Sequence, residues 1–246
     1  MPALRVLWHA LLSLYDETVT LVTANLLWVG LTLPVYLLLV VLGVPFADLA
    51  GTDSLAGWLL VGLALLLVLL PTPAGVGLSA VARQAAGPNA PRMRLFWDAL
   101  RARWRLGLAC FGVSLLLTAA ILFNIGFYLT HTDGWLRLAA ILWLYGLGFW
   151  LALHVYLMPL VHHVQQPRLL DVYRRAALIT LGHPGQSLLL VLVLLGVGLA
   201  SIVVLPAYVL VAPAYVALAQ AHALREVRRR HGDLALESDS EGGGSG

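Results

Sequence analysis

Long stretches without a charged residue constrain this chain more than any other feature. A helix needs about 20 mainly apolar residues to cross the roughly 30 Å hydrocarbon core of a bilayer. The whole chain is 61% hydrophobic and 11% charged, a surplus too large for one water-soluble core. The sequence therefore predicts an all-α protein, a polytopic bundle of transmembrane helices. The four clearest spans are residues 19–43, 55–82, 106–130 and 138–164, none of which contains Asp, Glu, Lys or Arg.

The last uncharged run, residues 187–224, is long enough for either one span or two. Pro206 and Pro213 near its middle favour a chain reversal, which gives spans at 187–205 and 207–224. All basic residues are arginine, and most of them gather at residues 83–105, at 168–175 and after 224. The positive-inside rule places these segments in the cytoplasm. Six spans in a bacterial inner membrane, with both termini cytoplasmic, satisfy this rule, whereas five would export the basic tail.

Two terminal segments flank the predicted bundle of residues 19–224. Leucines recur at helical spacing in residues 1–18, which predicts an amphipathic helix on the anionic inner leaflet. We expect no cleaved signal peptide, because the apolar run that follows is long enough to span. Residues 225–246 form a cytoplasmic tail that turns acidic and then rich in Gly and Ser, a composition typical of disorder. Whether its final GGGSG is native sequence stays open.

The two basic connections share an amphipathic pattern. In residues 92–105 the apolar side chains Met93, Phe96, Trp97, Leu100 and Trp104 fall on one helical face, opposite the arginines. Residues 168–181 repeat this pattern with Leu169, Val172, Tyr173 and Ala176. Such helices either anchor a bundle at anionic headgroups or dock a cytoplasmic partner. The candidate contact residues for lipid or partner are Arg94, Arg101, Arg105, Arg168, Arg174 and Arg175.

Prolines, glycines and amides inside the spans are candidates for a cavity or a hinge. Residues 71–77, with the sequence PTPAGVG, interrupt a span, and such breaks either line a cavity or simply kink a helix. The span centres lack charged residues, which argues against a carboxylate-driven symporter. The two amides have a second interpretation, because they also fix helix packing by hydrogen bonds. The candidates are Asn25, Pro34, Pro71, Pro73, Gly75, Gly77, Asn124 and Pro159.

Catalytic and metal-binding chemistry receives little support. His154, His162 and His163 have poor spacing for a shared metal ion, and no hydrolase, nucleotide or dinucleotide motif occurs in a suitable context. The single cysteine, Cys110, excludes a disulfide framework. We therefore expect no enzyme activity, no cofactor and no nucleic-acid partner, since the arginines lie between membrane spans.

Short motifs resemble the YesL-like family, bacterial integral membrane proteins with a domain of unknown function. The motif NLLW at residues 25–28, followed by Leu33-Pro34, resembles the first family block, and PTPA at residues 71–74, followed by Arg83, resembles the next. The stretch between these blocks is longer here than in the family. The later half is similar in pattern only.

The resemblance implies an accessory component of a carbohydrate-uptake system, with ABC-type sugar transporter subunits as partners and no catalytic residues. The alternative is a small permease for a neutral or polar solute, with a path past Asn25, residues 71–77 and Asn124. The oligomeric state stays open.

Overall fold

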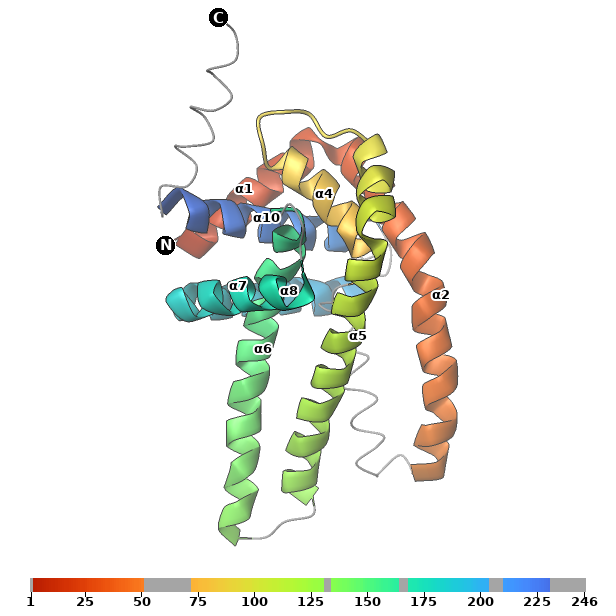
Figure 1. Cartoon of the computed structure of the whole chain (residues 1–246), viewed down its shortest axis with the longest axis vertical. Helices are drawn as coiled ribbons and strands as arrows, with labels where there is room; N and C mark the ends of the chain where they lie inside the picture. The colour runs from red at the N-terminus through yellow and green to blue at the C-terminus, as the bar shows by residue number, and fades with distance from the viewer. Residues whose placement is uncertain (1, 51–71, 131–133, 164–167, 204–209, 231–246) are drawn as a thin grey trace, which may run out of the picture.

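The computed structural model describes residues 2–50, 72–130, 134–163, 168–203 and 210–230 (Figure 1). Within these ranges the chain is helical and has no strand, which confirms the all-α prediction. The elements are α1 (Pro2–Asp16), α2 (Thr18–Ala50), α4 (Gly75–Ala85), α5 (Arg94–Thr130), the 3-10 helix η1 (Gly134–Leu138), α6 (Ala139–Val161), α7 (Leu169–Gly182), α8 (Pro184–Val203) and α10 (Ala212–Arg230).

Three long helices and a group of short ones divide the molecule. Helices α2, α5 and α6 run along its longest axis, while α1, α4 and α10 gather at one end and α7 crosses α6 (Figure 1). Helices α5 and α6 form an antiparallel hairpin joined through η1, and α4, α7, α8 and α10 all contact α6. The core therefore lies where the short helices surround the second half of α6.

Helix α6 changes its environment halfway along its length. All residues from Trp150 to Val161 are buried, because five helices surround this half. On the other half, Leu142 is 73% and Tyr145 is 82% exposed. An exposed apolar surface of this kind is typical of a helix that faces hydrocarbon.

Three helical segments of the described chain are long and apolar enough to cross a membrane. They lie in residues 18–35 of α2, in α5, and in η1 together with α6; a fourth is present if α7 and α8 count as one broken span. Six spans are not confirmed. Most of the predicted span 55–82 lies outside the described residues, and α10, which covers much of 207–224, is not among the candidate spans.

Helix α10 is buried by other helices along most of its length. It packs against α1, α4 and α6, and Ala214, Leu218 and Ala219 have no exposed surface. Small alanine side chains on this face allow the neighbouring helices to approach closely. The apolar composition of residues 212–224 therefore reflects an interior position in the protein.

The predicted amphipathic segments are helical, but they join the next helix in different ways. Residues 94–105 continue without interruption into the rest of α5. Helices α7 and α8 instead meet at an angle of 105°, at His183, whose φ of −137° and ψ of 56° are not helical. Pro184 explains this break, because proline disfavours the helical conformation of the preceding residue.

Candidate functional site: the basic end of the helix bundle

Nearly all described arginines lie on the short helices or on the first turns of α5. Arg137, in η1, lies instead at the opposite end of the α5–α6 hairpin (Figure 1). Helices α1, α4, α10 and the start of α5 form what we call the basic end of the bundle. The chain thus concentrates positive charge at one end of its apolar helices.

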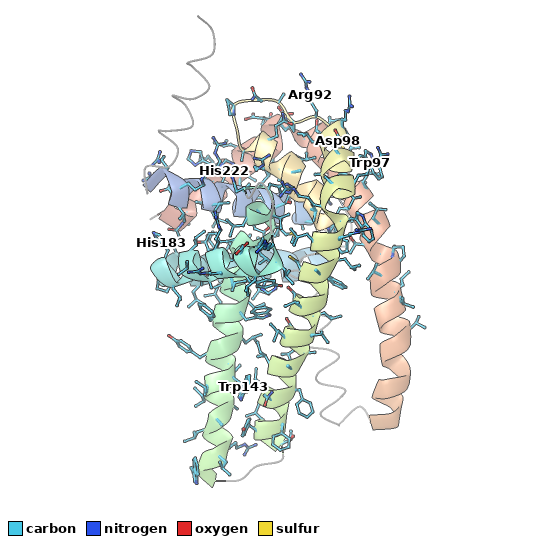
Figure 2. The ribbon with its side chains drawn as sticks, viewed as in Figure 1. Arg92, Trp97, Asp98, Trp143, His183 and His222 are labelled. Carbon is cyan, nitrogen blue, oxygen red and sulfur yellow. The ribbon has the colours of Figure 1, made fainter. Side chains whose placement is uncertain are left out.

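The start of α5 presents arginine and tryptophan side chains together. The side chain of Arg94 is 89% exposed and its Nε lies 3.4 Å from Oδ2 of Asp98, and Figure 2 shows Trp97 and Asp98 at this end of α5. Trp104 is half exposed, and the guanidinium carbon of Arg105 lies 5.5 Å from the centre of its ring, a distance typical of a cation–π contact. The predicted apolar face therefore splits, with Phe96 buried and both tryptophans exposed.

Helix α7 follows its predicted pattern more closely. Val172 and Ala176 have no exposed surface, while Arg168, Arg174 and Arg175 are exposed. The apolar face packs on α6, so these arginines remain available to a lipid headgroup or a partner. The same holds for Arg101 and Arg105, which are exposed on α5.

Polar contacts join α4, α5, α6 and α10 at the basic end. Nε2 of His162 lies 2.9 Å from Oγ of Ser79 and 3.0 Å from the carbonyl oxygen of Val76. Arg103 donates a hydrogen bond to the carbonyl oxygen of Val161 at the end of α6. Burial, together with the positive charges of Arg83 and Arg103, lowers the pKa of His162 to about 3. The ring is therefore neutral at neutral pH and connects α4 to α6.

A buried polar cluster between α5, α6 and α7 was not predicted. Nε2 of His154 lies 2.9 Å from Oγ of Ser114, and that oxygen lies 2.9 Å from the hydroxyl of Tyr173. Trp150 donates a hydrogen bond of 3.0 Å to Thr118. Ser114 and Thr118 are four residues apart, as are Trp150 and His154, so one turn of α5 faces one turn of α6. That matched spacing is a sequence signal that could have revealed the pairing.

This cluster resembles a Ser–His pair, but its surroundings favour a structural role. Nδ1 of His154 lies 2.7 Å from the carbonyl oxygen of Trp150, which can only accept, so Nδ1 carries the proton. Ser114 has no exposed surface, so its hydroxyl is closed to a substrate. The three histidines have separate partners, and the described residues contain no group of three His, Cys, Asp or Glu suited to a metal ion.

The residues around the predicted break at 71–77 form a tight helix contact. Trp28 donates a hydrogen bond of 2.8 Å to Oγ1 of Thr72, which also accepts from the backbone nitrogen of Gly75 at 3.0 Å. A Cβ placed on Gly77 would lie 2.9 Å from Cδ2 of Phe96, and one on Gly107 would lie 2.7 Å from a methyl carbon of Val76. These two glycines therefore allow α4 and α5 to approach closely.

A small apolar cavity of about 190 Å³ lies beside this contact, between α2, residues 72–74 and α5. Pro73 and Thr72 line it, together with Thr32. Thr32 is buried, and its hydroxyl has no hydrogen-bond partner among the described residues. One predicted candidate, Pro73, therefore does border a cavity.

The remaining cavity and hinge candidates are dispersed. Asn25 is buried in α2, whereas Asn124 donates a hydrogen bond of 2.8 Å to Ala120 of its own helix. Neither amide lines the cavity beside Pro73. Pro34 is exposed on α2, Pro159 is buried within α6, and Pro71 lies outside the described residues.

Comparison of the chain with family models, curated proteins and solved structures finds no match. The likeness to the YesL-like family consequently rests on the sequence motifs alone.

Proposed function

We propose that this protein is a non-enzymatic, multi-pass component of a bacterial inner membrane that assists a carbohydrate-uptake system. It docks its partner through the exposed arginines and tryptophans of α5 and the exposed arginines of α7. The observation that carries the proposal is the pairing of exposed Trp97 and Trp104 with arginine on one stretch of α5. Tryptophan and arginine are enriched among the residues that dominate binding energy at protein interfaces.

The distribution of charge supports an orientation with the basic end in the cytoplasm. Arginine-rich segments remain on the cytoplasmic side of bacterial inner membranes, and among the described residues Arg137 is the one arginine at the far end of the α5–α6 hairpin. The docking face would then lie at the height where the cytoplasmic subunits of an ABC-type transporter meet the membrane. The family resemblance favours such subunits as partners.

Charge reversal tests the docking face. Arg94→Glu combined with Arg101→Glu should abolish co-purification of transporter subunits with the tagged protein, because it reverses the charge of the docking face. Both side chains are exposed, so their replacement leaves the core intact. The matched control is Arg137→Glu, a charge reversal at the opposite end. Unchanged recovery of subunits with the double variant would refute the proposal, provided that circular dichroism shows the same helix content.

The buried hydroxyl of Thr32 favours one alternative, a small permease. A polar group without a partner beside a cavity is suited to contact a passing solute, although 190 Å³ is smaller than a typical ligand site of about 300 Å³ or more. The alternative predicts solute flux in liposomes that contain this chain alone. Thr32→Leu should then abolish flux, whereas Thr23→Leu, an exposed position on the same helix, should not. Absence of flux from the unaltered chain would refute it.

A further inference from the structure

A cleft of about 330 Å³ lies between α1 and α10, with the end of α4 beside it. Its volume is within the usual range for small-ligand sites, about 300–1,000 Å³. Figure 2 shows His222 on α10, beside α1. The side chains that determine its chemistry are Arg5, His9, His222, Arg225, Glu226 and Arg229.

The cleft carries an excess of positive charge. Three guanidinium groups line it against one carboxylate, that of Glu226. Oε2 of Glu226 lies 3.6 Å from Nη2 of Arg229 and is largely shielded from solvent by the protein. Nη1 of Arg225 lies close to Gly87, just beyond α4. Helices α1 and α10 therefore bring three guanidinium groups to one place, which suits an anion that accepts several hydrogen bonds.

Two histidines, His9 and His222, add uncharged hydrogen-bonding groups or further positive charge to the cleft, depending on their protonation. Their ring centres lie 6.1 Å apart. Nδ1 of His9 lies 2.6 Å from the carbonyl oxygen of Arg5 and donates to it, since a carbonyl only accepts. Nε2 of His222 lies 3.0 Å from Oγ of Ser13. Burial and the nearby charges of Arg225 and His9 lower the pKa of His222 to about 4, so its ring is neutral at neutral pH.

An apolar groove of about 440 Å³ lies at the other end of α1, where α2 begins. Leu11 and Tyr15 of α1 line it together with Thr18 and Val22 of α2 and with Val211, the residue before α10. At 3.6 residues per turn, Leu11 and Tyr15 form an exposed apolar stripe with Leu4 and Trp8, on a different face of α1 from Arg5 and His9. An exposed apolar face beside a cationic cleft is typical of a helix that lies at a lipid surface.

We propose that the cleft between α1 and α10 binds the phosphate of an anionic phospholipid, with Arg5, Arg225 and Arg229 as its cationic ligands. The site is separate from the docking face on α5, so it does not depend on the proposed partner. It would hold one lipid between α1 and α10.

Calorimetric titration of the full chain in a neutral detergent tests this site. Short-chain phosphatidylglycerol should bind with saturation, whereas phosphatidylcholine of the same chain length and inorganic phosphate should bind at least about tenfold more weakly. Equal affinity for inorganic phosphate and phosphatidylglycerol would overturn the assignment to a lipid. Equal affinity for the two lipids would overturn the role of the positive charge.

Two substitutions locate the binding site. Arg225→Gln should weaken phosphatidylglycerol binding about tenfold or more, because it removes one charge-assisted hydrogen bond. Arg5→Gln should act in the same direction, and its exposed position leaves folding unaffected. The matched control is Arg137→Gln, which removes the same charge at the far end of the molecule. Equal weakening by the control, or none by either cleft variant, would overturn the proposal.

Discussion

Replacement of Gly77 by alanine tests the close approach of α4 and α5. The new Cβ would lie 2.9 Å from both Cδ2 and the carbonyl oxygen of Phe96. Phe96 is fully buried, so its ring has little room to move, and the two helices must separate by several tenths of an ångström. Forced overpacking of this kind costs about 1–3 kcal/mol. Because 1.4 kcal/mol is a factor of ten, this contact should lower the folding equilibrium constant by about 5- to 150-fold relative to a glycine-to-alanine change that meets no neighbour.

Gly112→Ala is the matched control for this change. Gly112 lies in α5, and a Cβ there meets nothing within 4 Å. Both substitutions gain the same helix propensity, about 0.5–1 kcal/mol, so the difference between the variants isolates the contact with Phe96. The assay is unfolding in mixed micelles of mild detergent and dodecyl sulfate, followed by circular dichroism. Equal stability of the two variants would refute the close contact and would favour the hinge interpretation of Gly77.

Three further predictions concern polar groups and topology. Thr72→Val should destabilise the protein by about 1–3 kcal/mol, because it leaves the buried indole N–H of Trp28 unpaired. Thr32→Val should be neutral, since that hydroxyl has no partner to lose. Equal losses of stability in detergent unfolding would contradict this prediction. The pKa of His162 is lowered from 6.5 to about 3, so the unfolded chain binds a proton in that window that the folded chain does not, and stability should fall as the pH falls from 6.5 to 3; an equally steep loss in His162→Gln would exclude this ring as the cause. A cysteine at Trp135, an exposed position in η1, should react with an impermeant maleimide in intact spheroplasts, whereas one at Arg94 should react only after permeabilisation; the native cysteine is buried and gives little background, and the opposite pattern would reverse the orientation.

The length of the uncharged runs predicts the long helices of this protein. It does not predict whether a given run faces lipid or lies inside the protein. Residues 106–130 and 139–161 lie in long helices, as their uncharged length predicts. Residues 207–224 carry nearly the same signature, yet most of them belong to α10, which other helices bury. Composition alone does not distinguish a lipid-facing helix from a buried one, because both exclude charge. The neighbours of α10, which the sequence does not specify locally, decide between them.

Some features of the candidate site depend on the local sequence, whereas others depend on how distant segments pack together. The amphipathic face of α7 depends only on local spacing, and Val172 and Ala176 are buried as the pattern predicts. The pairing of His154 with Ser114 depends on how α5 and α6 align, which no single segment determines. Asn25 and Asn124 share a residue type but differ in depth within the bundle, so similar polar residues in two spans did not predict one shared cavity.

One proline explains why the two basic amphipathic segments occupy different places in the fold. On α5, nothing interrupts the helix between Arg94 and the apolar residues that follow, so the charged turns extend along the axis of the span. At the first residue of α8, Pro184 ends the preceding helix, and the 105° bend turns α7 across α6. This orientation brings the hydroxyl of Tyr173 to Ser114 and leaves Arg174 and Arg175 exposed on the outer face of α7. Similar sequence patterns therefore produce one axial and one transverse basic surface, and a partner that contacts both must span the angle between them.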